Sequence, residues 1–108
     1  MSNLNFNEIG QVIRVQLGQD LTLVSPLPTP SLILRPEIGE IKTITSGVTI
    51  PTSTVVVGEE TFYAYEYIEY TTIDGDLDYA GRWKKKYKLE FSTANIEQGD
   101  FEKFRVLT

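Results

Sequence analysis

A strict two-residue alternation near the C-terminal end constrains the fold of this chain more than any other feature. Between Arg82 and Phe91, large apolar side chains occupy one set of positions and charged side chains the other. Successive side chains of a β-strand point to opposite faces of a sheet, so this pattern predicts a strand with one face in a core. Lys85 is the one charged residue predicted to point inward. The inward apolar set is Trp83, Tyr87, Leu89 and Phe91, and the outward set is Lys84, Lys86, Lys88 and Glu90.

The remaining apolar segments also favour strands. The segment Gln11–Leu17 alternates in the same way, and Thr61–Thr72 is the longest predicted strand. Pro26, Pro28 and Pro30 predict an extended loop, because proline cannot donate a ladder hydrogen bond. Further short strands are predicted over residues 21–24, 31–35, 41–45, 54–57 and 101–107.

No segment repeats its apolar residues every 3.6 positions over the length that an independent helix needs. Many short strands separated by turn signals are typical of an antiparallel sandwich. The predicted fold class is therefore all-β, an antiparallel immunoglobulin-like β-sandwich of about seven or eight strands.

The length of 108 residues suits one domain. Residues 1–10 are mostly polar and are predicted to form an extended N-terminal arm that ends at Gly10, with residues 11–108 as the single domain. Leu4, Phe6 and Ile9 are the apolar residues with which this arm could contact a partner. No membrane span is expected, because the longest apolar runs are far shorter than the roughly 20 residues that a span needs. No signal peptide is expected either, because Met1-Ser2-Asn3-Leu4-Asn5 lacks the basic and apolar regions of one.

The chain contains neither cysteine nor histidine. Disulfides and thiolate nucleophiles are thereby excluded, together with the imidazole that supplies most general bases near neutral pH. We therefore expect no catalytic residues, no cofactor and no enzyme activity. The formal net charge of −5 weighs against binding to nucleic acid.

The acidic turn Asp74–Asp78 is the densest cluster of possible cation ligands. Its spacing departs from the helix-loop-helix calcium motif, because Tyr79 and Lys85 occupy the positions where that motif requires Gly and Glu. We therefore expect a structural turn without metal, in which Leu77 fills part of the core.

Two groups of side chains are candidates for contact with a partner. Lys84, Lys86 and Lys88 form a basic strand face, which could meet a polyanion or an acidic protein, or could be an ordinary solvated face that discourages edge pairing. Tyr63, Tyr65 and Tyr67 form a tyrosine stripe if the Thr61–Thr72 strand is continuous, and such a stripe serves either as an interface or as core packing.

One stretch carries a resemblance to a known family. Tyr70-Thr71-Thr72-Ile73-Asp74-Gly75-Asp76-Leu77-Asp78-Tyr79-Ala80-Gly81-Arg82-Trp83, with the terminal Phe104-Arg105-Val106-Leu107, resembles small Ig-like structural proteins of tailed bacteriophages and the N-terminal domain of phage baseplate upper proteins. In that pattern a strand ends in Tyr-Thr-Thr, a corner buries its Leu, and Gly-x-Trp opens the next strand. Residues 70–107 carry the likeness, whereas the Pro26–Pro30 loop and residues 39–60 depart from it.

The resemblance implies a phage virion structural protein, either a capsid decoration or cement protein or a tail or baseplate adaptor. It also implies that the partners are other virion proteins, that several copies occur in a symmetric assembly, and that no nucleic acid or membrane is bound. Synthesis in the bacterial host cytoplasm and residence in the virion follow. The alternative is a receptor- or carbohydrate-binding module of a tail fibre, which would use the tyrosine face or the loops at one end of the sandwich.

Overall fold

The computed structural model describes residues 3–5, as backbone, together with residues 9–78 and 80–107. Within these residues the protein is all-β, with 51% strand and no helix, and its arrangement is consistent with a β-sandwich. No helix of the described chain could therefore cross a membrane. The strands are β1 (Asn3–Asn5), β2 (Val12–Gln16), β3 (Thr29–Pro36), β4 (Lys42–Ile44), β5 (Val55–Val57), β6 (Glu60–Phe62), β7 (Tyr67–Thr71), β8 (Gly81–Ser92), β9 (Asn95–Gln98) and β10 (Glu102–Leu107).

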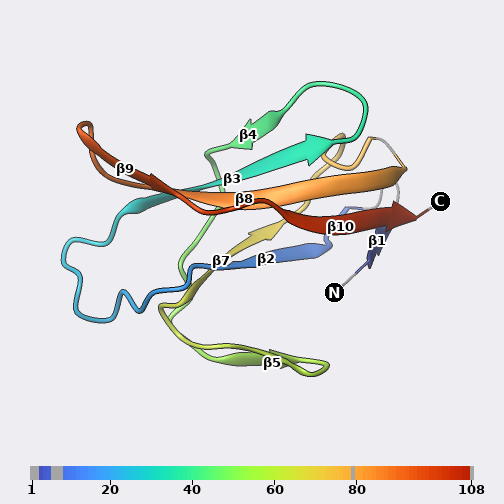
Figure 1. The fold of residues 1–108 in the computed structure, drawn as a ribbon. Helices are drawn as coiled ribbons and strands as arrows, with labels where there is room; N and C mark the ends of the chain where they lie inside the picture. The colour runs from blue at the N-terminus through green and yellow to red at the C-terminus, as the bar shows by residue number, and fades with distance from the viewer. Residues whose placement is uncertain (1–2, 6–8, 79, 108) are drawn as a thin grey trace.

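A six-stranded sheet, which we call sheet A, forms one layer (Figure 1). Its strand order is β1-β10-β8-β3-β4, and β9 pairs with the far end of β8. All neighbours are antiparallel except β1 and β10, which are parallel. The longest strand, β8, pairs with three others and is the central element of the sheet.

The main core lies between sheet A and the antiparallel pair β2–β7. The alternation predicted for β8 is confirmed, because Trp83 and Leu89 are buried whereas Arg82 and Lys84 are exposed. The predicted inward face of β2 is also buried and packs in the same core. The buried cluster comprises Ile13, Val15, Leu17, Leu21, Leu32, Leu34, Val48, Ile68, Tyr70, Leu77, Trp83, Leu89, Phe104 and Val106.

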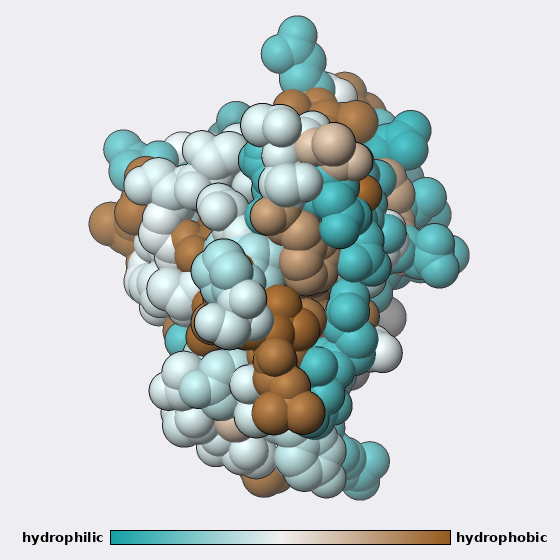
Figure 2. All heavy atoms as spheres, turned by 90° about the vertical axis from the view of Figure 1, so that its left-hand side faces the viewer, coloured by the Kyte–Doolittle hydropathy of each residue, from teal (hydrophilic) through white to brown (hydrophobic). Residues whose placement is uncertain are grey.

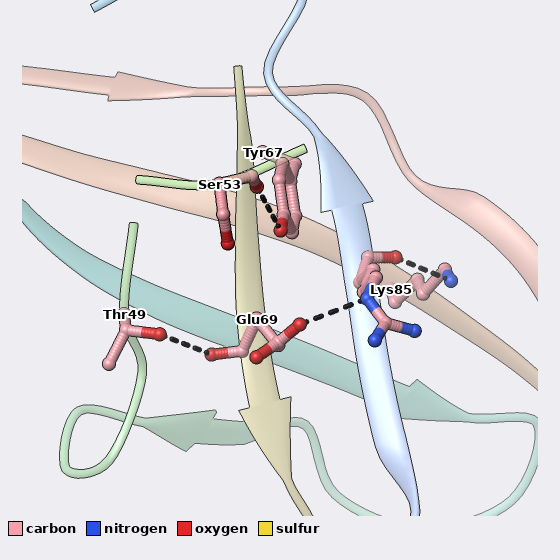
Figure 3. Close-up of polar contacts among 6 residues, drawn as sticks. Thr49, Ser53, Tyr67, Glu69 and Lys85 are labelled. Atoms are coloured by element: carbon pink, nitrogen blue, oxygen red, sulfur yellow. Dashed lines mark hydrogen bonds and ion pairs between the residues drawn. The ribbon is translucent and has the colours of Figure 1, made fainter. Parts of the chain in front are cut away.

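Lys85 joins the two layers. Its side chain points inward, as the sequence predicts, and its Nζ donates a hydrogen bond of 2.8 Å to the carbonyl oxygen of Arg14 on β2 (Figure 3). The same ammonium lies 5.7 Å from the centroid of the Phe104 ring. Burial lowers the pKa of Lys85, while the negative charges of Glu102 and Glu60 act in the opposite direction.

A third layer covers the side of β2–β7 that faces away from sheet A. It is the antiparallel β5–β6 pair with the loops that flank it, and we call the paired strands the β5–β6 ribbon (Figure 1). Phe62 of the ribbon packs against Tyr67 with ring centroids 5.3 Å apart. The Tyr67 hydroxyl donates to the carbonyl oxygen of Ser53 at 3.0 Å (Figure 3). Tyr67 is consequently fully buried.

The corner between β7 and β8 is fixed by Asp76. Its Oδ2 accepts a hydrogen bond of 2.6 Å from the Tyr70 hydroxyl and one of 2.7 Å from the Ile73 amide. Leu77 is buried beside this turn, as predicted. Burial, together with the Asp76 carboxylate, raises the pKa of Tyr70 to about 12.

The predicted continuous strand Thr61–Thr72 is wrong. The chain forms β6 and β7 and turns between them at Tyr65, whose φ of 65° lies in the left-handed region. This conformation is held by backbone hydrogen bonds, since the Tyr65 amide donates to Pro51 and its carbonyl accepts from Leu21. These two backbone hydrogen bonds therefore outweigh the preference of the aromatic residues in this segment for a continuous β-strand.

Several other boundaries also differ from the sequence prediction. Residues 21–24 form turns rather than a strand, although Leu21 is buried. Pro30 and Pro36 both lie inside β3, where they pair with Leu89 and Trp83 of β8. The strand β9 lies between the strands predicted to end at residue 91 and to begin at residue 101, where no strand was predicted, and residues 3–5 of the predicted arm pair with β10. The described residues thus contain ten strands rather than seven or eight.

Alkaline titration tests the Tyr70–Asp76 corner. Because the folded-state pKa of Tyr70 is raised from 10.0 to about 12, the folded state retains this proton where the unfolded state loses it. The stability contribution of Tyr70 is therefore complete below pH 10 and is lost as the pH rises toward 12. Urea unfolding from pH 8 upward should show a loss of about 2–3 kcal/mol from this residue. Tyr70→Phe should lose correspondingly less, and an equal loss in both proteins would contradict the assignment.

Candidate functional site

Seven of the ten lysine and arginine residues of the chain project from the outer face of sheet A. We call this surface the basic face. Lys84 of β8 lies opposite Lys103 of β10 on one side and opposite Arg35 of β3 on the other. The register also places Arg82 opposite Arg105. The full set is Arg35, Arg82, Lys84, Lys86, Lys88, Lys103 and Arg105.

Acidic side chains do little to neutralise the basic face. Among the described residues, its one ion pair joins Arg82 Nη1 to Glu37 Oε2 at 4.0 Å, and both side chains are largely exposed. Glu90 also lies on this face, at the opposite end of β8. Like charges directly opposite each other on neighbouring strands destabilise a sheet. The repulsion between these cations therefore lowers the stability of the isolated protein, and an anionic partner would offset this repulsion.

A hollow lies in the basic face where β3, β8 and β10 run side by side. Its volume is about 580 Å³, and its lining includes five cationic residues and Glu37. The cations are Arg35, Arg82, Lys84, Lys103 and Arg105. An open site lined in this way can accept several carboxylates at once, through charge-assisted hydrogen bonds.

Phe101 adds an aromatic ring beside the hollow. The Lys86 ammonium lies 4.6 Å from the ring centroid and the Arg35 guanidinium 5.9 Å from it. These cation–π contacts hold two cations on the face without cancelling their charge. The sequence prediction named Lys84, Lys86 and Lys88 as one basic strand, and the sheet register adds Arg35, Lys103 and Arg105 to it.

The predicted tyrosine stripe does not form. Tyr63 is 55% exposed, whereas Tyr67 is fully buried under the β5–β6 ribbon. Tyr65 lies in the turn between β6 and β7 and packs against the main core. The three residues share no surface, because the turn breaks the two-residue alternation on which the stripe depends.

The contact residues predicted in the arm are only partly described. Leu4 lies in β1, which pairs with β10, and Ile9 is 60% exposed. Phe6 lies outside the described residues. The role of these three residues in binding a partner stays a prediction.

The acidic turn is used structurally. Asp76 binds Tyr70 and Ile73, and Asp78 forms an ion pair of 2.9 Å with Lys42. No group of three potential metal-ligating side chains comes together in the described part of the chain.

A second exposed surface lies at the end of the sandwich that holds the loop before β3 and the β8–β9 turn (Figures 1 and 2). Apolar side chains stand among polar ones on this end (Figure 2). Leu23 is 96% exposed, Leu27 40% and Ile96 45%. Leu23 falls within the strand predicted over residues 21–24, so its exposure was not predicted.

Comparisons with protein-family models, with curated proteins and with solved structures each found no match to this chain.

Neutralising the basic face should stabilise the isolated protein. Because Lys84 and Lys103 repel each other across β8 and β10, the double variant Lys84→Gln/Lys103→Gln should raise the free energy of unfolding by about 0.2–1 kcal/mol at low salt. The gain should shrink at high salt, where the repulsion is screened. Urea unfolding of the double variant and of the unaltered protein, at low and at high salt, measures this gain in the free energy of unfolding.

Lys42→Gln is the matched control, since this lysine is ion-paired with Asp78 and donates to two backbone carbonyls. It should lower the stability rather than raise it. A basic-face double variant that is destabilised as much as Lys42→Gln would show that these cations serve the fold.

Proposed function

We propose that this protein is a non-catalytic attachment module of a tailed-bacteriophage particle, with an Ig-like sandwich that docks through its basic face onto acidic surfaces of neighbouring virion proteins. The observation that carries the docking role is the gathering of seven of the ten cations on one sheet face, where the one ion pair among the described residues joins Arg82 to Glu37 at 4.0 Å. The phage assignment is supported by the resemblance of residues 70–107 to phage structural proteins.

The geometry of the corner is compatible with that resemblance. In the family pattern the corner leucine is buried and the tryptophan opens a core strand. Here Leu77 and Trp83 are both 1% exposed, and Trp83 is the third residue of β8. This agreement supports the comparison of folds, while the basic face supports the mode of attachment.

A docking role suits the physical character of the basic face. Complementary charge steers partners together and fixes their orientation more than it adds affinity. The hollow between β3 and β10 offers a place where carboxylates can leave bulk water. A module held in this way would be positioned by sheet A and would need no catalytic group.

The alternative function, a receptor- or carbohydrate-binding module of a tail fibre, has weaker support. One of its two surfaces was the tyrosine stripe, which burial of Tyr67 removes. The other was the loops at the end of the sandwich, where the most exposed large hydrophobic side chain is Leu23. We therefore favour attachment to the particle.

Reversing charge on the basic face tests the proposal. Lys84→Glu/Lys103→Glu should reduce the incorporation of the protein into phage particles by tenfold or more, because acidic partner groups would then be repelled. Quantitative mass spectrometry of purified particles measures the copy number. The matched control, Lys84→Arg/Lys103→Arg, keeps the charge and should be incorporated normally.

Circular dichroism of both purified variants establishes that they fold. Normal incorporation of a folded, charge-reversed variant would refute docking through the basic face. Absence of the unaltered protein from the particles would refute the phage assignment itself.

A further inference from the structure

The charges of this protein are separated in space. The three cations outside the basic face are each engaged elsewhere: Arg14 pairs with Glu69 at 3.0 Å, Lys42 pairs with Asp78, and Lys85 bonds a carbonyl inside the sandwich. The chain nevertheless carries 15 acidic residues. The part of the chain outside the basic face therefore carries a formal excess of negative charge.

The turn of the β5–β6 ribbon carries part of this negative charge. Glu59 and Glu60 are exposed there, next to the positive-φ residue Gly58. Glu60 also has neighbours in its own chain, because Gln16 Nε2 donates to its Oε2 at 3.5 Å. Its negative charge acts to raise the pKa of both Lys85 and Glu102, whereas burial, the largest influence on each, lowers the pKa of Lys85 and raises that of Glu102. The ribbon turn thus concentrates carboxylates on a protruding element.

The ribbon and the basic face lie on opposite sides of the molecule. The ribbon covers the side of β2–β7 that faces away from sheet A, because Phe62 packs on Tyr67 there. The basic face is the side of sheet A that faces away from β2–β7. Sheet A, the β2–β7 pair and β5 accordingly follow one another across the molecule in Figure 1.

We propose that the basic face binds a second copy of this chain, with Glu59 and Glu60 of one copy seated in the hollow of the next. This inference rests on the proposed docking role of the basic face and names its partner. Two basic faces would repel each other, which disfavours an isologous contact. A contact between unlike surfaces on opposite sides joins copies head to tail, and it closes into a ring or continues as a row.

The size of the hollow and the side chains exposed on the ribbon both suit this contact. The hollow of about 580 Å³ lies within the range of about 300–1,000 Å³ typical of ligand pockets, and it has room for two glutamate side chains. Val56 and Val57 of the ribbon are 66% and 42% exposed, so apolar surface stands beside the carboxylates. The ribbon can therefore supply both parts of an interface, an apolar contact and complementary charge.

Sedimentation velocity of the full chain tests the proposal at salt concentrations from about 0.01 to 1 M, over which the Debye length falls from about 30 to 3 Å. The unaltered protein should form species larger than a monomer at low salt and dissociate at high salt. Two variants, each with the charges of one surface neutralised, test the two surfaces independently. The face variant is Lys84→Gln/Lys103→Gln, and the ribbon variant is Glu59→Gln/Glu60→Gln.

Each variant alone should be monomeric at low salt, because each retains only one of the two complementary surfaces. An equimolar mixture should form heterodimers and nothing larger, because the intact ribbon of one variant meets the intact face of the other. Asp74→Asn/Glu97→Gln removes two carboxylates elsewhere and should assemble like the unaltered protein.

A protein that stays monomeric at every salt concentration and at high protein concentration would overturn self-association. Variants that still assemble singly, or a mixture that forms no heterodimer, would overturn the pairing of ribbon and face. If the protein is monomeric but its incorporation into particles still depends on Lys84 and Lys103, the docking function survives and only this inference fails.

Discussion

The two-residue alternation along β8 divides the central strand of sheet A into a buried side and a charged side. One strand of 12 residues carries the central core residues Trp83 and Leu89 on one side and four cations on the other. Burying tryptophan and leucine supplies the hydrophobic stabilisation, and it fixes the direction in which every other side chain of β8 points. A shift of one residue would place Lys84, Lys86 and Lys88 in the core, so the register of the whole sheet is strongly specified.

The second layer is attached to this strand by both polar and apolar contacts. Lys85 crosses the core to cap the Arg14 carbonyl oxygen, which satisfies a backbone acceptor that β7 does not reach. At the end of β7, Asp76 binds Tyr70 and turns the chain toward β8. These contacts place the β2–β7 pair beneath sheet A and leave the outer face of sheet A open to a partner.

The sequence predicted those parts of the fold that depend on local alternation. The alternation of β2 and β8, the buried Leu77 and the strand near residues 101–107 were all predicted correctly. The break at Tyr65 could not be predicted, because it depends on hydrogen bonds to Pro51 and Leu21, which are distant in sequence. The loss of the tyrosine stripe follows directly from that break.

The candidate site was predicted only in part, because some of its residues share one strand whereas others come together only through strand pairing. Lys84, Lys86 and Lys88 share a face of one strand, and alternation alone identifies them. Arg35, Lys103 and Arg105 join them only through the pairing of β3 and β10 with β8, which single-strand patterns do not encode. The charge separation of the molecule is therefore a property of the sheet rather than of any one segment.

Carboxylate-to-amine cross-linking in intact particles is the most direct test of docking through the basic face. Because a carbodiimide joins only groups that are already in contact, it reports which lysines meet acidic side chains of another chain. Docking through the basic face predicts cross-links from Lys84, Lys86 or Lys103 to aspartate or glutamate of a neighbouring subunit, either a virion protein or a second copy. Particles that contain this protein but whose intermolecular cross-links all lie away from the basic face would contradict it.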